Sequence, residues 1–544
     1  MLPLPSFKSP LTVIIRSLLL VSSLLVSFVA CQRVSPSEEK GSPAYQLRDI
    51  AYNENLKPFY HGVASGDPLA DRVIIWTRVT PEVIHSVNVS WEVATDSAFT
   101  QVVQTGELTT SQDQDFTVKV DVSGLVPDQV YYYRFRALDT NSSIGRTKTA
   151  PDTAQDSLRL AFASCSNYEF GHFNAYGHMA AQPVFDAVVH LGDYIYEYAT
   201  GVYGDTAQYG RINVPAHEIV TLEDYRTRYA LYRADPELQA AHGSHPWITI
   251  WDDHEISNDA YTEGAENHDE TEGRYQDRRQ AAVQAYYEWL PVRGTPSDPL
   301  YRNFSFGPLA QLMVLDGRLA GRTAQADADS LAVLLDSSRT MLGATQREWL
   351  QQQLAATEAT WKVLGNQVIF SGLDASALPN TPDKFTDMWD GYPIERAKLI
   401  NFLKEQGVEN LIVGTGDFHS SLGMEIPNDP FRPATYSRAD NGQRLGVEFV
   451  VHSVNASNIN EWVGADTVEQ IRQVYLSPKY NPHVRHANLS DHGYVELRLT
   501  PQAAEIRWKY LNTLGERDYS LKQTHVMRVS AYSSRLEPVN DEVL

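Results

Sequence analysis

Apolar and polar positions follow two different spacings along this chain. Between residues 56 and 150, short runs such as VNVSWEVATD at 87–96 alternate apolar and polar residues, and turn-forming Gly, Pro, Asp and Ser separate them. From 158 onward, apolar runs such as LRLAFASC at 158–165 and AVVHLGDY at 187–194 flank segments of helical composition. The first spacing predicts β-strands, and the second predicts β-α-β units.

The first of these regions predicts a β-sandwich domain over 56–150. The segment SGLVPDQVYYYRFRA at 123–137 is similar to the tyrosine corner of fibronectin-type sandwiches. In the second region, helices are expected over 273–290, 344–356 and 393–407. Residues 32–55 are polar and predict a linker, and residues 521–544 are expected to form a C-terminal tail.

The N-terminus predicts export. Lys8 and Arg16 precede the apolar stretch LLLVSSLLVSFVA at 18–30, which is short for a membrane helix and is typical of a signal peptide over 1–31. Ala30 directly before Cys31 resembles the lipobox of bacterial lipoproteins, in which the cysteine is lipidated. Phe28 departs from the usual Leu of that pattern, so simple signal cleavage remains the alternative. The expected location is the periplasm or the cell surface.

Composition narrows the classes of protein. The 544 residues are 42% hydrophobic, which is enough for a large buried core, and 45 basic against 68 acidic residues give a net charge of −23. Without a Lys/Arg-rich block, nucleic acid is not an expected partner. An acidic chain can still act on anionic substrates when metal cations reverse the field at its site. With Cys31 lipidated or removed, Cys165 is the one cysteine left, so no internal disulfide is expected.

Metal-binding residue types gather where three apolar runs end. The segments are VVHLGDYIYE at 188–197, ITIWDDHE at 248–255 and LIVGTGDFHS at 411–420. In α/β folds the ends of buried strands carry the chemistry, and adjacent carboxylates repel one another unless a cation or a strong donor offsets their charge. These segments predict a metal site that includes Asp193, Tyr196, Asp252, Asp253, His254, Asp417 and His419.

Each of these residues also has an ordinary structural interpretation. Asp193 can be a strand-end acid beside core tyrosines, and WDDHE can be a helix cap with solvated charges. Cys165, which ends the first strand, can be an inert buried thiol or a thiolate ligand of iron. His254 can protonate a leaving group or hold a phosphoryl oxygen, and Asn258 lies close enough in sequence to contribute.

Several further segments carry a family resemblance. FYHGVASGDPLADRVIIWTR, FASCSNYEFGHFNAYGHMA, HLGDYIYEY, WDDHEISND, WKVLGNQVIF, DMWDGYPIERAKLI, GTGDFHSS and NPHVRHANLSDHGYVEL follow one another over almost all of 56–500. Their order resembles that of the PhoD-type alkaline phosphatases. The resemblance implies that residues 156–520 form an α/β (α+β) metallophosphatase core of two packed mixed sheets flanked by helices, related to purple acid phosphatases.

The resemblance also implies the ligands. It places Cys165, Asp193, Tyr196 and His419 around Fe³⁺, and it shares Asp193 with Ca²⁺. The other calcium ligands would be Asp253 and Asp417, with Asp252 and Asn258 as further candidates. Arg78, which closes WTR in the sandwich, is a candidate phosphate contact because a guanidinium pairs with two phosphate oxygens. LDGRLAGRT at 315–323 departs from the family's LDTR, which leaves open what Asp316 and Arg318 do.

The implied activity is hydrolysis of small phosphate monoesters and diesters through a metal-bound hydroxide. A dedicated phosphodiesterase or phospholipase on the same scaffold is one alternative. A non-catalytic surface binding protein is another, although such a protein would have no need to keep these ligands together. We expect a monomer that meets a membrane only through a lipid anchor at Cys31.

Overall fold

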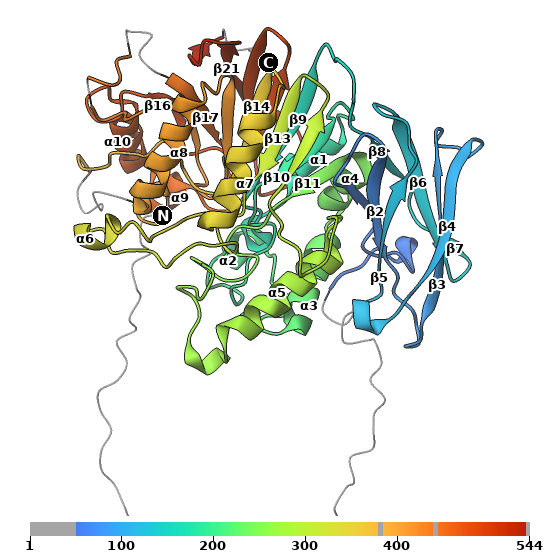
Figure 1. The fold of residues 1–544 in the computed structure, drawn as a ribbon. Helices are drawn as coiled ribbons and strands as arrows, with labels where there is room; N and C mark the ends of the chain where they lie inside the picture. Colours follow the sequence, from blue (N-terminus) through green and yellow to red (C-terminus); the bar gives the residue numbers. More distant parts are fainter. Residues whose placement is uncertain (1–49, 379–384, 433, 439–443, 540–544) are drawn as a thin grey trace, which may run out of the picture.

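The computed structural model describes residues 50–378, 385–432, 434–438 and 444–539 (Figure 1). The predicted export signal over 1–31, the lipidation site Cys31 and the linker up to residue 49 lie outside these residues. The last linker residues are packed, since Ile50 is buried in the main core and Tyr52 contacts Tyr60 with ring centroids 4.9 Å apart. The predicted linker boundary at 55 is therefore wrong. None of the described helices combines the length and apolar character needed to span a membrane.

The larger sheet has, within the described ranges, ten strands in the order β22-β21-β20-β19-β9-β10-β11-β1-β2-β5. Strands β9, β10, β11 and β1 are parallel to one another, and antiparallel strands flank them on both sides. The bounds are β1 Val63–Gly66, β2 Arg72–Arg78, β5 Thr117–Ser123, β9 Leu158–Ala163, β10 Ala187–His190, β11 Pro246–Thr249, β19 Gly493–Leu499, β20 Ala503–Leu511, β21 Leu521–Ser530 and β22 Glu537–Pro538.

The second sheet has seven strands among the described residues, in the order β12-β13-β14-β15-β17-β16-β18. Its central strands β13, β14, β15 and β17 are parallel. The bounds are β12 Arg302–Phe306, β13 Ala310–Val314, β14 Trp361–Asn366, β15 Leu411–Thr415, β16 Ser421–Pro427, β17 Arg444–Val450 and β18 Val484–Asn488. Both sheets are therefore mixed, as the sequence predicts.

The two sheets pack face to face around one apolar core. Phe162 of β9 meets Phe449 of β17 edge to face, with ring centroids 5.0 Å apart, and Val363 of β14 belongs to the same cluster. Leu354 and Leu399 cover the outer face of the smaller sheet. The helices are α1 Asn174–Ala180, α2 Thr206–Tyr209, α3 Leu222–Arg233, α4 Pro236–Ser244, α5 Tyr275–Trp289, α6 Leu331–Leu334, α7 Gly343–Ala356, α8 Pro393–Glu405, α9 Ile459–Val463 and α10 Ala465–Leu476. The structure thus has helices α5, α7 and α8 where three are expected.

The N-terminal region is a sandwich that shares a sheet with the core. A smaller sheet of β4 Val102–Thr110, β3 Val87–Ala94, β6 Val130–Ala137, β7 Thr140–Asn141 and β8 Gly145–Lys148 packs on β1, β2 and β5. The Tyr131 hydroxyl accepts a hydrogen bond from the backbone N–H of Val126 at 2.8 Å, as in a tyrosine corner. Strand β1 also pairs with β11, so one sheet of the predicted β-sandwich continues into the core sheet.

The C-terminal boundary is also corrected by the structure. Strand β21 pairs antiparallel with β20 along most of its length, and β22 pairs with β21. The predicted tail over 521–544 therefore contributes two strands to the larger sheet. This strand is not predicted from the sequence, because its first residues, LKQTH, are mostly polar and some of them are exposed.

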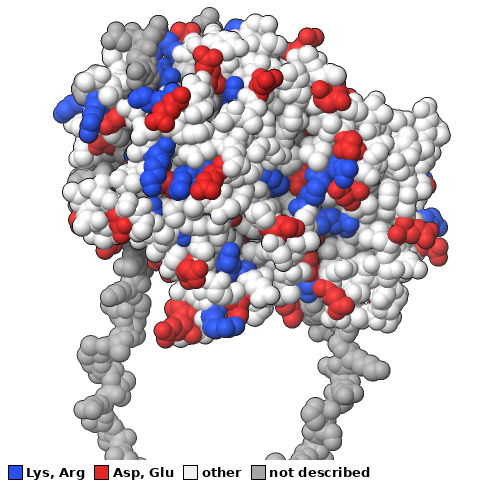
Figure 2. All heavy atoms as spheres, in the orientation of Figure 1, with Lys and Arg blue, Asp and Glu red and all other residues white. Residues whose placement is uncertain are grey.

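Charged side chains are interleaved on the surface drawn in Figure 2. Acidic and basic groups alternate over this face, and no broad basic area appears there.

Candidate metal centre

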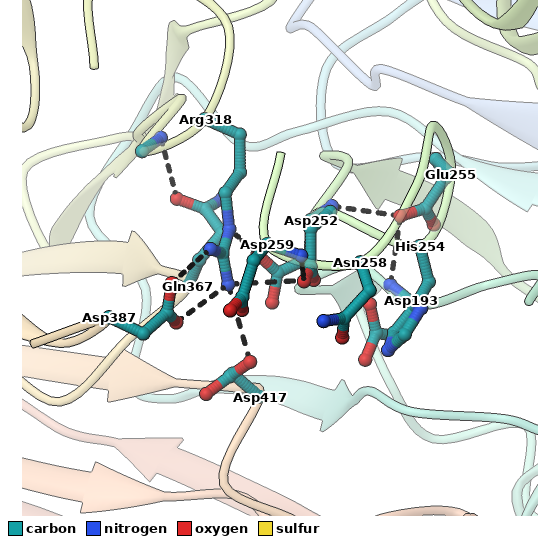
Figure 3. Close-up of polar contacts among 12 residues, drawn as sticks. Asp193, Asp252, His254, Glu255, Asn258, Asp259, Arg318, Gln367, Asp387 and Asp417 are labelled. Carbon is teal, nitrogen blue, oxygen red and sulfur yellow. Dashed lines mark hydrogen bonds and ion pairs between the residues drawn. The ribbon is translucent and has the colours of Figure 1, made fainter. Parts of the chain in front are cut away.

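The predicted ligands lie where parallel strands of both sheets end. Cys165 follows β9, Asp193 follows β10, Asp252 follows β11 and Asp417 follows β15. Because parallel strands place their carboxyl ends at one edge, these four loops meet at the same end of the sandwich. Figure 3 shows the acidic side chains gathered there around Arg318.

The structure brings these side chains into three overlapping groups. Within each group, the potential ligand atoms lie within 4.8 Å of one another. The groups are Cys165 with Asp193 and His419, Asp193 with Asp253 and His254, and Asp252 with Asp253 and Asp417. Since Asp193 and Asp253 each belong to two groups, the three form one continuous centre that can hold more than one cation.

Tyr196 and Asn258 flank this centre. The Tyr196 hydroxyl donates to Asp193 Oδ2 at 3.0 Å and lies 3.2 Å from His419 Nε2, which places the phenol beside the group that contains Cys165. Asn258 donates its backbone N–H to Glu197 at 2.7 Å and its side-chain N–H to Glu266 at 3.2 Å.

Four of the predicted ligands have left-handed backbone conformations. The φ angles are 60° at Cys165, 56° at Asp193, 59° at Asp417 and 58° at His419. Non-glycine residues pay about 1–3 kcal/mol for such strain, and it persists where the surrounding structure enforces it, commonly at functional sites. The folded structure therefore holds these four residues in strained backbone conformations that direct their side chains toward the same centre.

Glu255 helps to hold the strained loops in place. Its buried carboxylate accepts the backbone N–H of Asp193 at 3.0 Å, of Tyr194 at 2.6 Å and of Asp252 at 2.8 Å. One side chain thus ties the loop after β10 to the loop after β11. Glu255 is absent from the sequence-based prediction, although it ends the WDDHE segment.

Several buried atoms of the centre have no hydrogen-bond partner in the described part of the chain. They are Asp193 Oδ1, Asp252 Oδ2, Asp253 Oδ1, His254 Nε2 and Asp417 Oδ2. A buried carboxylate oxygen without a donor is costly, and in proteins such oxygens are normally paired or bound to a cation. Carboxylate, imidazole, phenol and thiol groups are all metal ligands once they are deprotonated. The donor set therefore fits metal ions.

Arg318 is the main residue that the sequence-based prediction did not place. Its guanidinium, which is fully buried, forms ion pairs with Asp252, with Asp253 at 3.5 Å, with Asp417 at 3.3 Å and with Asp387 at 2.8 Å. It binds Oδ1 of Asp252 and of Asp417, whereas Oδ2 of each has no partner. Arg318 thus orients these acids and offsets part of their repulsion.

Burial and mutual repulsion set the pKa values of the acids. Burial raises the pKa of Asp417 to about 6, with Asp387 adding to the shift, and burial likewise raises the pKa of Asp252 and of Asp253. At Asp193 burial acts in the same direction, but His254 and His419 outweigh it and hold its pKa at about 2. Asp193 is therefore the most readily ionised of the four.

The thiol and the phenol are neutral in the metal-free protein. Burial, followed by the charge of Asp193, raises the pKa of Cys165 and of Tyr196 well above their ordinary values. Since the anionic forms of these groups are the ones that bind metals, a cation has to displace their protons on binding.

His254 lies against aromatic rings and a second glutamate. Its Nδ1 is 2.7 Å from Glu197 Oε2, and its ring centroid is 4.3 Å from that of Tyr196. Burial acts to lower the pKa of His254, but Glu197, Asp193 and Asp253 outweigh it and raise the pKa well above its usual value. Glu197 ends the segment HLGDYIYE, and its position in the motif is the signal that could have identified it.

Arg78 lies elsewhere in the molecule. Its side chain is 1% exposed within β2, pairs with Asp115 at 2.7 Å and donates to the Thr80 hydroxyl at 2.9 Å. The guanidinium also lies 5.2 Å from the ring of Trp289. The predicted phosphate contact is therefore wrong, because the guanidinium is buried between Asp115 of the N-terminal region and Trp289 of α5.

Comparisons with known proteins agree with this geometry. The PhoD-like phosphatase family model matches residues 160–508, and the model of the PhoD-like phosphatase N-terminal domain matches 45–151. Alkaline phosphatase D of Bacillus subtilis is 37% identical over 511 residues, which cover 90% of this chain and 81% of the relative. A solved structure described as PhoD has a TM-score of 0.79 and 35% identity, and the match covers 91% of this chain and 94% of that one.

Both parts of the chain match corresponding parts of one family, in the same order, and the identity extends over nearly the whole length. The chain therefore belongs to the PhoD-like phosphatase family of enzymes.

Proposed function

We propose that this protein is a metal-dependent hydrolase of small phosphate esters. The observation that carries the proposal is the convergence of five buried ligand atoms, which have no hydrogen-bond partner in the described part of the chain, from three strand-end loops. The family relationship supports the same reaction class.

The donor types favour two kinds of cation. Cys165, Asp193, Tyr196 and His419 combine a thiol, a carboxylate, a phenol and an imidazole, a set that suits Fe³⁺. Oxygen donors from Asp252, Asp253, Asn258 and Asp417 suit Ca²⁺, which takes six to eight oxygen ligands. Asp193 belongs to two of the groups and is the residue placed to bridge the two kinds of ion.

The chain's own groups provide the remaining chemistry. When bound, the ions activate water and neutralise phosphoryl charge. His254 Nε2 faces the centre without a protein partner, so it can hold a phosphoryl oxygen or carry a proton to the leaving group. Arg318 keeps the acids in place, and burial of the whole centre excludes bulk water.

Metal analysis joined to turnover tests this proposal. Purified full-length protein should contain iron and calcium and absorb visible light through thiolate- or phenolate-to-iron charge transfer. It should hydrolyse an aryl phosphate, lose that activity in strong chelator and recover it with Fe³⁺ plus Ca²⁺. Unchanged hydrolysis by fully demetallated protein would exclude the mechanism, and zinc as the sole metal would exclude the proposed ions.

The same assay separates the alternatives. Comparable rates on mono-aryl and bis-aryl phosphates would support hydrolysis of both monoesters and diesters. Turnover confined to the bis-aryl ester would instead indicate a dedicated phosphodiesterase or phospholipase. No turnover with the metals fully loaded would indicate a surface binding protein.

Export and a monomeric state complete the proposal. Residues 1–31 have the composition of an export signal, and Cys31 is the residue available for lipidation. Mass spectrometry of the mature N-terminus distinguishes a lipidated Cys31 from simple cleavage. Light scattering of purified protein tests the monomer.

A further inference from the structure

A buried carboxylate lies directly behind His254. Glu197 is fully buried and His254 is 1% exposed, and 2.7 Å separate Glu197 Oε2 from His254 Nδ1. Water has no access to this contact, so the two side chains determine each other's hydrogen bonding.

The second oxygen of Glu197 is already occupied. Oε1 accepts the backbone N–H of Asn258 at 2.7 Å and the side-chain amide N–H of Asn267 at 3.0 Å. An ionised carboxylate only accepts hydrogen bonds, so His254 Nδ1 has to be the donor in its contact with Oε2. The opposite ring nitrogen, Nε2, has no hydrogen-bond partner among the described residues, and His254 belongs to one group of potential ligands with Asp193 and Asp253.

Aromatic rings hold the imidazole in this orientation. The ring of Tyr196 lies 4.3 Å from that of His254, and the ring of Tyr203 is nearly parallel to it at 6.3 Å. Rotation of the imidazole would break the bond to Glu197 and disturb these contacts.

We propose that Glu197 is the positioning residue of His254: it fixes the proton on Nδ1 and thereby presents Nε2 to the centre. The functional part of this inference rests on the proposed hydrolase activity. Carboxylates commonly orient metal-site histidines through the other ring nitrogen, and loss of such a partner costs about 10- to 100-fold in activity or metal affinity.

Glu197→Gln reverses the hydrogen bond with little change in shape. Because Asn258 and Asn267 both donate to the Oε1 position, the amide oxygen of the glutamine has to stay there. Its NH₂ group then faces His254 Nδ1, which has to become an acceptor, so the imidazole proton moves to Nε2.

Nitrogen NMR measures which ring nitrogen of His254 carries the proton. The sample is the full chain with ¹⁵N-labelled histidine, loaded with Ca²⁺ and with diamagnetic Ga³⁺ in place of iron, and a His254→Asn spectrum assigns the signal. We expect a protonated Nδ1 in the wild type and an unprotonated Nδ1 in Glu197→Gln. An unprotonated Nδ1 in the wild type would overturn the proposal, whether or not the variant folds.

Kinetics separate positioning from simple support of the fold. Glu197→Gln should lower kcat by about 10- to 100-fold and change KM by less than about threefold. The matched control is Glu395→Gln, which removes another buried carboxylate. Glu395 lies on α8 and accepts hydrogen bonds from Thr340 and from Arg347 of α7. The control should lose thermal stability and keep its kcat. Equal kcat values for Glu197→Gln and wild type would contradict the positioning role.

The two proposals fail in different ways. If the metal-loaded wild type hydrolyses no phosphate ester, the proposed function is wrong, while the nitrogen spectrum still decides where the Nδ1 proton lies. If the wild type is active and Nδ1 is unprotonated, the role of Glu197 alone is wrong.

Discussion

Two buried arginines, one in each region of the molecule, differ in the carboxylates around them. In the N-terminal region, Arg78 forms an ion pair with Asp115 at 2.7 Å, and both side chains are at most 3% exposed. At the strand ends, the fully buried Arg318 faces four carboxylates.

The comparison distinguishes an ion pair that stabilises the fold from a cluster of acids that can bind cations. A buried ion pair such as that of Arg78 with Asp115 needs good geometry and further hydrogen bonds to be stable. Around Arg318 there are four acids, one of which, Asp387, also pairs with Arg322. Burial raises the pKa of Asp252, Asp253 and Asp417, and the negative charge of neighbouring acids adds to the shift. Excess negative charge of this kind favours the binding of cations.

The largest expected effect comes from Asp193→Asn. Asp193 joins two of the three ligand groups and is the most readily ionised acid of the centre, so its neutral replacement should remove bound metal. We expect phosphatase activity to fall by at least about a thousandfold, or about 4 kcal/mol of barrier. Activity assays with elemental analysis measure both changes, and retained iron and calcium with full activity would contradict the comparison.

Asp115→Asn makes the same chemical change in the other region. It removes the carboxylate that pairs with the buried Arg78 guanidinium at 2.7 Å, which should cost about 3 kcal/mol in the free energy of unfolding. Metal content and kcat of the folded variant should equal those of the wild type. Urea unfolding and elemental analysis provide the measurements, and a loss of metals would show that the regions are coupled.

Arg318→Met tests the excess charge itself. Without the guanidinium, the acids repel one another more strongly, and the metal-free protein should lose about 2 kcal/mol of stability. Added Ca²⁺ should therefore raise the melting temperature more in this variant than in the wild type. Arg322→Met is the matched control, because Arg322 is also buried and, among the described residues, forms its ion pair with Asp387, at 2.5 Å. Equal calcium responses in all three proteins would refute this account.

The smallest expected effect concerns a buried neutral group. Burial lowers the pKa of His452 to about 3, and its ring bonds to Ser421 at 3.0 Å and to the carbonyl of Lys509 at 3.1 Å. Below about pH 6.5 the unfolded chain takes up a proton that the folded chain refuses, so stability falls as pH decreases toward 3. His452→Asn should reduce this slope by about 1.4 kcal/mol per pH unit. Urea unfolding at pH 5, 6 and 7 measures it, and an unchanged slope would refute it.

Much of the fold could be predicted because its signals are local. Apolar runs with polar ends identified β9, β10, β11 and β15, and helical periodicity identified α5, α7 and α8. The ligand-type residues after these strands were visible for the same reason, since each belongs to a short segment with its own strand.

The missed features depend on distant partners. Strand β21 carries polar residues that only pairing with β20 explains, and the N-terminal sandwich shares its sheet with the core through the pairing of β1 with β11. The misplaced Arg78 has the same cause. A guanidinium in a strand suits phosphate equally well in sequence, and only its contact with Asp115 decides its role.

The sequence alone determined which strands end in acids, imidazoles, a phenol and a thiol, because strand periodicity and residue chemistry act over a few neighbouring positions. Only the tertiary structure decided that Arg318 lies among four acids and that Glu197 lies behind His254. Those contacts join residues 57 or more positions apart, and their energies arise from burial and charge balance that exist only once the sheets have packed.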